Sequence, residues 1–492
     1  MQNKIEIFNN QVIINYNLAY PKSREVLLKS QTFAKFVQYF IEYQETDNAN
    51  MYAYLTKNGE LNSKEASYDF CHFLRLLSIF TCEELKDEYY LSDKDATLDV
   101  IEEMYRTWRS LQRFGYMKSD NSTDFGINTL VAFDSASNDL LLRTYRLFEE
   151  KLMGRPNLVY RQVQAGTNAC FSIHTLDKVW ADEYAALQDI PMIDTVMLRT
   201  PMILHPKSSK RTGMFTEIDT QPMTYFNKGE SNWFCYPCKV GALLCFVYFN
   251  SKYMSSALSM ANLFELATKE ESAQKPDLVV IFGNDDGNDD TNFYYDEAND
   301  IWVGCISDNP RIEYFGYLKK MCLTLHNLAQ MKKGWLPIHG AFVNIYLKDG
   351  TKKGIMLMGD SGAGKSESIE ALKAAAGDMI REVEVVFDDM GTIHLEDGVP
   401  YGQGTEIGAF IRLDDLDPGT PYRDMDRSIF MAPENPNSRM IQPAAPYRVV
   451  VHNHKIDLFA YANNYTNEFG LKKLTVQEVK DTCKLGKRMA LG

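Results

Sequence analysis

The 492-residue sequence lacks a long apolar run. Its longest apolar stretch, near Ala242–Phe249, is far shorter than the about 20 residues that a membrane-spanning helix needs. The opening residues, Met1–Ile7, are polar and do not lead into the apolar core of a signal peptide. We therefore expect a soluble cytoplasmic protein that does not act in a membrane.

The sequence is also poor in cysteine and in positive charge. Its nine cysteines follow no repeating framework, which favours reduced thiols in the cytoplasm over a disulfide scaffold. The one close pair, Cys235 and Cys238, has no second pair to complete a zinc site, so we interpret both as buried thiols. The net charge of −14 argues against a general nucleic-acid or anionic-membrane surface. It is compatible with a local basic pocket for an anionic substrate.

A chain of this length exceeds one ordinary core, which predicts two or three domains. Residues 1–155 are predicted to be mainly helical, because apolar residues recur at three- and four-residue spacing. This spacing is found in Arg24–Tyr43, Ser67–Ser78 and Leu98–Phe114. We interpret this part as an accessory region or a partner surface.

Strands and turns dominate residues 156–310, and residues 311–492 alternate strands with helices around a glycine-rich loop, which together predict an α/β fold. The acidic loop Gly283–Asp290 lacks the ligand spacing of an EF-hand, so we interpret it as a solvated turn. A helix is expected over Ser255–Leu266. Strands are expected over Leu158–Arg161, Ala169–Ile173, Val196–Leu204, Leu243–Phe249 and Asp277–Phe282.

The most informative stretch is Gly354–Glu367, which predicts a buried strand (Ile355–Met358), a glycine-rich loop and a helix that opens at Lys365. The loop has the pattern G-x-x-x-x-G-K-[ST], whose backbone N–H groups point at phosphate oxygens. Lys365 would reach the β- and γ-phosphates, and the Ser366 hydroxyl would hold a Mg²⁺ ion. The predicted nucleotide-binding residues of the loop are Gly359, Asp360, Ser361, Gly362, Ala363, Gly364, Lys365 and Ser366.

A phosphate loop needs an acidic partner for its cation. Val383–Phe387 predicts a strand that ends at Asp388 and Asp389, which would put carboxylates at a strand's carboxyl edge beside the nucleotide. We therefore interpret this pair as part of a metal site rather than as a solvated turn. Read alone, Lys320 is a charge on a helix surface and His339 is a structural histidine at the start of a strand.

Two further motifs precede the loop: Tyr314-Phe-Gly-Tyr-Leu-Lys-Lys320 at a helix start and Lys333-Gly-Trp-Leu-Pro-Ile-His339 in a strand. In this order they resemble the ATP-type phosphoenolpyruvate carboxykinases. The resemblance covers about residues 240–460, roughly half the chain. It extends to Leu243–Leu266, Tyr294–Gly304, Glu434–Arg439 and Asp457–Ala462.

The resemblance implies a set of metal ligands. Lys320 and His339 match the family's ligands of a Mn²⁺ ion, with Asp389 (or Asp388) as the carboxylate ligand. A lysine can ligate a metal only when neutral, so its pKa must be depressed. A second cation, Mg²⁺, would accompany ATP, or another nucleoside triphosphate, on Ser366.

The resemblance also implies a reaction, the nucleotide-dependent interconversion of oxaloacetate with phosphoenolpyruvate and CO₂. The core would be a P-loop-containing, phosphoenolpyruvate-carboxykinase-like one, with 156–310 as its N-terminal α/β domain and 311–492 as its catalytic domain. Besides Lys320, the catalytic residues implied are Tyr314, near phosphoenolpyruvate and CO₂, and Arg439, which would bridge the transferring phosphoryl group.

The sequence departs from that family in four places. Its loop, Gly-Asp-Ser-Gly-Ala-Gly-Lys-Ser, is closer to that of the HPr kinase/phosphorylases. Ala409 stands where the family has a phosphoryl-contacting lysine. The family's substrate-binding Gly-Arg-Ser-Pro motif is not visible, and Arg161 and Arg199 are the candidate substitutes. The base-binding region is short, with Arg488 as a candidate nucleotide ligand, so the chain is either truncated or has a compact base site.

Two alternatives stay open. A kinase of the same fold would pass the γ-phosphate to a serine or a small-molecule hydroxyl, with Asp388 as the general base. A non-catalytic nucleotide-binding regulator would use the helical region for its contacts. The expected partner is a small-molecule substrate, oxaloacetate or phosphoenolpyruvate, and no nucleic acid or membrane. The sequence determines neither the nucleotide base nor the oligomeric state.

Overall fold

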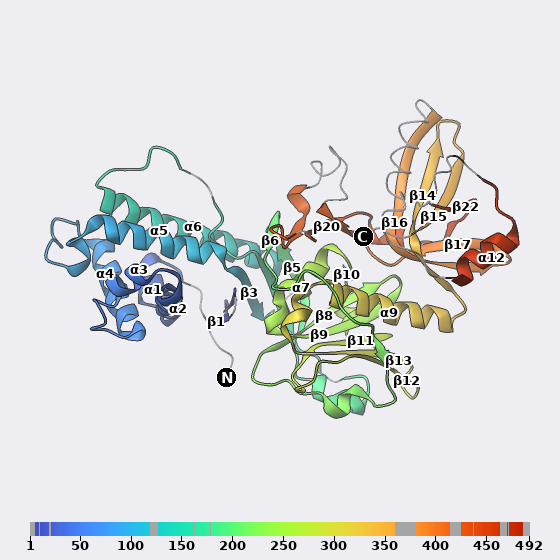
Figure 1. Cartoon of the computed structure of the whole chain (residues 1–492), viewed down its shortest axis with the longest axis horizontal. Coiled ribbons are helices and arrows are strands. Elements are labelled where there is room, and N and C mark those ends of the chain that lie inside the picture. The colour runs from blue at the N-terminus through green and yellow to red at the C-terminus, as the bar shows by residue number, and fades with distance from the viewer. Residues whose placement is uncertain are drawn as a thin grey trace. The chain divides into compact units, whose positions relative to one another are not determined.

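The computed structural model of the chain describes most of its residues, and all statements below refer to these. They are residues 5–8, 10–18, 21–118, 126–160, 163–177, 179–359, 379–413, 425–435, 437–462, 470 and 472–485. The chain divides into two compact units, Met1–Thr175 with Pro191–Arg199 and Leu176–Ile190 with Thr200–Gly492. Both combine helices with β-sheet, so the predicted α/β class is confirmed (Figure 1). The finer division into 156–310 and 311–492 stays a prediction.

The first unit is a sheet with helices packed on it. Its strands follow the order β1 (Ile5–Phe8), β2 (Gln11–Asn15), β3 (Gln112–Lys118), β4 (Ala169–His174) and β5 (Met192–Leu198). Its helices are α1 (Arg24–Lys29), α2 (Gln31–Asp47), α3 (Ala49–Leu55), α4 (Ser63–Ile79), α5 (Lys94–Ser110) and α6 (Gly126–Met153).

The apolar spacing explains these helices. Their apolar faces bury side chains such as Phe40 and Phe70 completely in one core, together with residues of β1 and β2. Asn62 begins α4 with a capping box, in which its side chain accepts from Glu65 N while the Glu65 carboxylate accepts from Asn62 N. The helix predicted to run to Phe114 ends at Ser110, because the chain turns into β3.

The second unit contains three groups of strands. The first has the order β8 (Trp233–Val240), β9 (Leu243–Asn250), β11 (Leu278–Asn284), β13 (Ile301–Ser307), β12 (Thr291–Asp296) and β7 (Thr216–Glu217), with β10 (Glu265–Leu266) beside β8. The second has the order β21 (His454–Lys455), β17 (Val399–Gly404), β16 (Ile380–Glu396), β14 (Leu336–Leu347), β15 (Lys352–Met358) and β22 (Leu458–Tyr461). The third is β18 (Gly408–Arg412), β20 (Arg439–Pro443), β19 (Ile429–Met431) and β6 (Met202–Leu204).

Helix α9 (Gly316–Lys332) connects the first two groups of strands. It packs against β11, β13 and β8 and also against β14. Every residue of β11 is buried, as expected for a strand that is covered on both faces. The remaining helices of the unit are α7 (Met254–Ser259), α8 (Lys269–Ser272), α11 (Tyr447–Val450) and α12 (Val476–Leu485).

Several predicted elements need correction. Residues 158–160 of the strand expected over Leu158–Arg161 are not in a strand, and Arg161 lies outside the described residues. The strand expected over Val196–Leu204 is divided into β5 and β6. The helix expected over Ser255–Leu266 ends at Ser259 and is followed by a 3₁₀ turn and β10. The interpretation of Cys235 and Cys238 is confirmed, since both are buried free thiols in β8.

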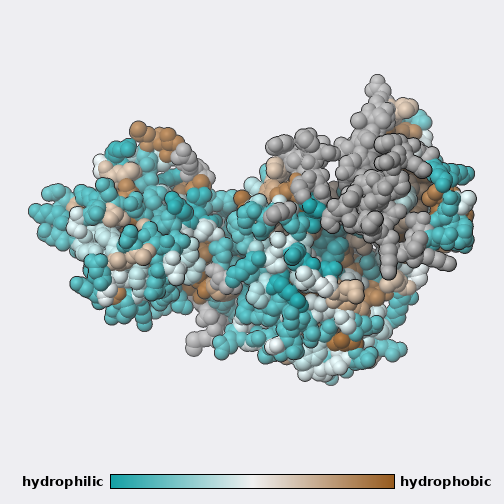
Figure 2. Space-filling view, in the orientation of Figure 1, coloured by the Kyte–Doolittle hydropathy of each residue, from teal (hydrophilic) through white to brown (hydrophobic). Residues whose placement is uncertain are grey.

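The visible face of the molecule in Figure 2 is largely hydrophilic, with hydrophobic residues scattered over it. No helix of the described residues is both long and apolar enough to cross a membrane.

The buried His326 of α9 makes stability depend on pH. The ring is 1% exposed, and burial lowers its pKa from 6.5 to about 4. The unfolded chain therefore binds the extra proton between these two values, so stability is lost as the pH falls from about 6.5 towards 4. We expect the unfolding free energy of the native protein, relative to His326→Gln, to fall by roughly 3 kcal/mol over this range. Urea titrations at several pH values measure it, and a difference that is constant with pH would contradict the prediction.

Candidate functional site

Strand pairing brings the start of the glycine-rich loop close to Asp389. In β14, Gly340 is paired with Met358 of β15 on one side and with Asp389 of β16 on the other. At about 4.8 Å between neighbouring strands, Met358 and Asp389 are roughly 10 Å apart. Gly359, the first residue of the loop, donates its backbone N–H to the carbonyl of His339 (3.2 Å). The row Met358–Gly340–Asp389 thus links the loop to the aspartate pair.

Gly340 is required in this row. A Cβ atom at this position would lie 2.4 Å from the backbone oxygen of Leu357, closer than real contacts allow. The residue after His339 must therefore be glycine if β14 and β15 are to approach as they do.

The backbone at Asp389 departs from regular β geometry. The strand predicted to end at Asp388 and Asp389 continues to Glu396, so the prediction of a strand end at this pair is wrong. In a regular antiparallel pair, the side chain of Asp389 would lie on the face of Gly340, opposite to that of His339. Instead, Asp389 has a φ of +143°, and its Oδ1 is 2.8 Å from His339 Nε2. Such a backbone is rare outside glycine and recurs at functional sites.

Helix α9 supplies two lysines to the same carboxylate. Lys319 Nζ lies 2.5 Å from Asp389 Oδ2 and 3.0 Å from Glu406 Oε1. Lys320 Nζ lies 3.9 Å from Asp389 Oδ2. The Lys319 side chain is 1% exposed, whereas that of Lys320 is 41% exposed. Lys319 is therefore a buried partner of two carboxylates, and Lys320 is the lysine that a ligand can reach.

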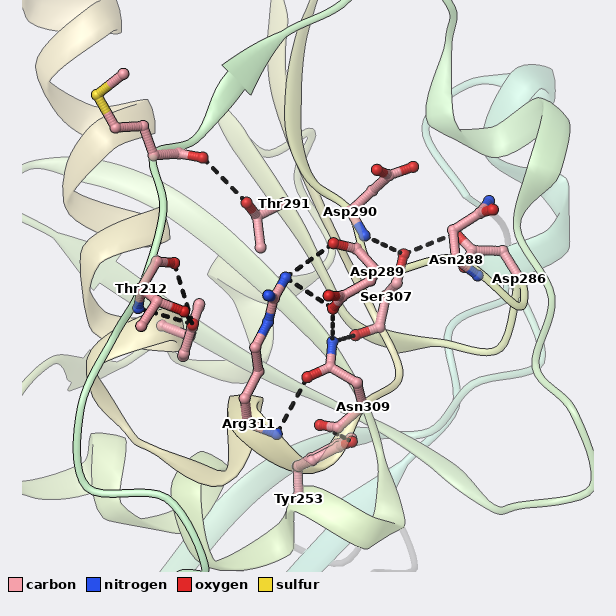
Figure 3. A network of polar contacts seen from close by, with 12 residues as sticks. Thr212, Tyr253, Asp286, Asn288, Asp289, Asp290, Thr291, Ser307, Asn309 and Arg311 are labelled. Atoms are coloured by element: carbon pink, nitrogen blue, oxygen red, sulfur yellow. Dashed lines mark hydrogen bonds and ion pairs between the residues drawn. The ribbon is translucent and has the colours of Figure 1, made fainter.

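The segment before α9 is held by a polar network (Figure 3). Asn309 accepts from Arg311 N at 3.1 Å and donates to Asp289 Oδ1 at 2.7 Å, and Arg311 forms an ion pair with Asp289 at 2.7 Å. The acidic loop Gly283–Asp290 therefore holds the segment before α9 in place through Asp289, and it is more than a solvated turn. The helix starts at Gly316, where a Cβ would lie 2.3 Å from the Tyr314 ring. The glycine lets Tyr314 fold against the first turn.

Three possible metal donors meet at this point: Lys320 Nζ, His339 Nε2 and the carboxylate of Asp389. Imidazole nitrogen and carboxylate oxygen are donors that first-row divalent cations such as Mn²⁺ accept. Among the described residues, no cluster of three or more His, Cys, Asp or Glu side chains could hold a metal. The donor set here fits a cation only if the third ligand is the amine of Lys320.

The electrostatics of the cluster lower the pKa of Lys320. Burial lowers the pKa of Lys320, and the charges of Lys319 and Arg211 act in the same direction against the opposing effect of Asp389. Burial also disfavours the charged form of Lys319, but Asp389 and Glu406 outweigh it and raise the pKa of that amine. The two neighbouring lysines therefore have opposite pKa shifts, raised for Lys319 and lowered for Lys320, because their partners differ.

The pKa values of the two carboxyl groups, Asp389 and Glu406, are also shifted in opposite directions. Burial alone would raise the pKa of Asp389, but Lys319, His339 and Lys320 hold it well below its usual range. Burial raises the pKa of Glu406 to about 7, although Lys319 opposes this. Asp389 is thus the permanent anion of the cluster.

Two other predicted residues, Tyr314 and Arg439, lie next to the ring of Phe410 in β18. Lys319 Nζ lies 5.3 Å from its centroid, the guanidinium carbon of Arg439 lies 5.4 Å from it, and the Tyr314 ring lies 6.3 Å from it. Arg439 Nε is buried and has no hydrogen-bond partner among the described residues. The structure therefore brings Tyr314 and Arg439 to the lysine–aspartate cluster.

The sequence analysis missed three residues of this region. Glu406 is buried against Lys319, and Arg412 is paired directly with Arg439 across β18 and β20. Arg211 is close enough to Lys320 to affect its pKa. None of the three belongs to a motif, and only pairing between distant segments identifies them.

The other predicted residues have different positions. Ala409 is buried in β18 and paired with Gln442. Asp388 is paired with Ala341, one position before Asp389. Arg199 belongs to the first unit, where it forms an ion pair with the buried Asp134. The loop residues Asp360, Ser361, Gly362, Ala363, Gly364, Lys365 and Ser366, and also Arg161 and Arg488, lie outside the described residues.

Comparison with known proteins adds no family to this description. No protein-family model and no curated protein sequence matches the chain.

The role of Asp389 can be tested separately from that of the adjacent Asp388. In Asp389→Asn the buried Lys319 loses one of its two carboxylates and keeps Glu406, so the cost stays below the about 3–5 kcal/mol of a buried charge left without any partner. We expect a measurable loss of stability below this value in thermal denaturation. Asp389 is the carboxylate ligand that the motif resemblance implies, and loss of a supporting residue alone costs about 10–100-fold, so we expect Mn²⁺ affinity, measured by calorimetry, to fall at least about 100-fold.

Asp388→Asn is the matched control, because it neutralises the adjacent carboxylate of the same strand. It should keep Mn²⁺ affinity within a few-fold of the native protein. Equal losses in both variants would contradict the assignment of Asp389 as the ligand.

Proposed function

We propose that the chain is a phosphoenolpyruvate-carboxykinase-like enzyme, a lyase and phosphotransferase. The observation that carries the proposal is the meeting of Lys320 and His339 at the two oxygens of one carboxylate, Asp389. Asp389 belongs to the strand row Met358–Gly340–Asp389. The proposed phosphate loop begins at Gly359, directly after Met358, and Gly359 donates its backbone N–H to His339. The motif resemblance predicts all four of these residues together, whereas chance would leave them scattered.

The proposal includes two cations and a nucleotide. Mn²⁺ would be held by Lys320, His339 and Asp389, and Mg²⁺ would accompany a nucleoside triphosphate on the loop at Lys365 and Ser366. When bound, Mn²⁺ supplies positive charge against the enolate oxygen that forms as CO₂ leaves oxaloacetate. The chain's own contribution would be to lower the pKa of Lys320 and to keep Asp389 ionised, as the pKa shifts of both groups favour.

The reaction itself is a decarboxylation followed by phosphoryl transfer. The C–C bond to the departing CO₂ breaks, and its electron pair remains as the enolate. The enolate oxygen then attacks the γ-phosphorus in line, and the bond to the β-phosphate oxygen breaks to give the diphosphate. Arg439, with Arg412 opposite it, would neutralise charge on the transferring group. Arg211 is a candidate for the substrate-binding arginine of the motif that this sequence lacks, because its charge lowers the pKa of Lys320.

A kinase of the same core is the second candidate, and Ala409 favours it. This side chain is buried and apolar, so position 409 supplies no cation to the phosphoryl group. In the kinase, Asp388 would accept the proton of the acceptor hydroxyl. The two reactions share the phosphate loop and differ in whether Lys320 is needed as a metal ligand.

The carboxykinase assay distinguishes them. With Mn²⁺, ADP, phosphoenolpyruvate and bicarbonate, we expect oxaloacetate to form, detected by coupling to malate dehydrogenase. Lys320→Met should lower kcat at least about 100-fold, because it removes a metal ligand. Lys332→Met is the matched control, since Lys332 is at the far end of α9 and forms an ion pair with Asp300; its rate should stay unchanged.

The contrary result is also specific. If no oxaloacetate forms while ATP is consumed with a hydroxyl acceptor, and Lys320→Met leaves that consumption intact, the kinase replaces the carboxykinase.

A further inference from the structure

One buried charge beside the proposed metal site has no part in the reaction described above. The Glu406 side chain is 3% exposed, and neither of its oxygens has a hydrogen-bond partner among the described residues. Its compensation is an ion pair with Lys319, in which Oε1 lies 3.0 Å from Nζ. Burial of a carboxylate with so little compensation is costly, which points to a role beyond stability.

The buried Lys319 is shared between this carboxylate and that of Asp389. Its Nζ lies 2.5 Å from Asp389 Oδ2 and 3.0 Å from Glu406 Oε1. The Lys319 side chain is 1% exposed, so salt and water screen its charge only weakly. A cation that binds at Asp389 is therefore repelled by Lys319, unless the charge of a second anion offsets that repulsion.

The position of Glu406 relative to Asp389 is fixed by hydrogen bonds that do not involve Lys319. The carbonyl of Thr405 accepts from Gly241 N at 2.8 Å. The hydroxyl of Thr405 donates to the carbonyl of Met390, the residue after Asp389, at 3.0 Å. The segment that carries Glu406 is thus connected directly to the strand that carries Asp389.

We propose that Glu406 is a positioning residue of the metal site and that it acts through Lys319. This inference rests on the metal site of the proposed function, and not on which of the two reactions takes place there. Lys319 and a divalent cation compete for the carboxylate of Asp389. Glu406 offsets the charge of Lys319, so that Asp389 stays available to the cation.

Glu406→Gln tests this role, because it keeps the shape of the side chain and removes its charge. Lys319 then acts on Asp389 with its whole charge, and the Mn²⁺ affinity of the full-length protein should fall about 10–100-fold, the usual effect of losing a residue that supports a metal ligand. Calorimetry measures the affinity at about pH 8, above the pKa of Glu406, which burial raises to about 7.

Glu271→Gln is the matched control. Glu271 also forms an ion pair with a lysine of the second unit, Lys239, at 3.1 Å, and this pair has no contact with Asp389. The substitution should leave Mn²⁺ affinity unchanged.

The double variant Lys319→Met/Glu406→Gln separates the proposed role from a purely structural one. It removes both charges of the pair, so no lysine at position 319 competes for Asp389, and Mn²⁺ affinity should return at least to that of the native protein. If Glu406 were only a structural partner of Lys319, the second substitution would remove a further contact and restore nothing.

The double variant also guards against a failure to fold. It leaves no charge of this pair without its partner, so its affinity can be compared directly with that of the native protein even if Glu406→Gln does not fold. The far-UV circular dichroism of each variant shows whether it has folded.

Two results would overturn this inference alone. They are an unchanged Mn²⁺ affinity in folded Glu406→Gln, and an affinity of the double variant at least about tenfold below that of the native protein. A native protein that does not bind Mn²⁺ would overturn the metal site together with the inference. Because the readout is metal affinity, a negative carboxykinase assay bears on the proposed reaction and not on the role of Glu406.

Discussion

The carboxylate of Asp389 is the interaction on which the second unit depends. Its two oxygens contact Lys319 and Lys320 from α9 and His339 from β14, so one side chain connects a helix to two strands. Lys319 extends the cluster to Glu406. Because a buried charge without a partner is costly, the member whose removal costs most is Lys319, which is the buried partner of both Asp389 and Glu406. The cluster is therefore a structural junction of the second unit.

The same cluster explains why two neighbouring lysines differ. Lys319 is buried between two carboxylates and stays charged, whereas Lys320 lies at the accessible edge with a lowered pKa. A lowered pKa is what an amine needs to serve as a metal ligand. The row Met358–Gly340–Asp389 then sets the distance from this edge to the start of the glycine-rich loop. Local strand register, rather than any single residue, joins the proposed metal and nucleotide positions.

Local patterns predicted the elements of the site, and long-range pairing determined which of their side chains meet. The strand before the loop, the helix of Lys320 and the strand of His339 could be predicted because each has its own periodicity or motif. The end of the strand at Asp388 and Asp389 was predicted wrongly, since an acidic pair resembles a loop while β16 continues through it. Choosing Asp389 over Asp388 required the positive φ and the register. Glu406, Arg412 and Arg211 could not be predicted, because their partners are distant in sequence.

The central claim is that Lys320, as a neutral amine, is a ligand in a metal site with His339 and Asp389. The most direct test is electron-nuclear double resonance of Mn²⁺ bound to protein labelled with ¹⁵N only at lysine. The account predicts a ¹⁵N hyperfine coupling that disappears in Lys320→Met and persists in Lys332→Met. Bound Mn²⁺ without any ¹⁵N coupling, or with a coupling that survives Lys320→Met, would contradict it.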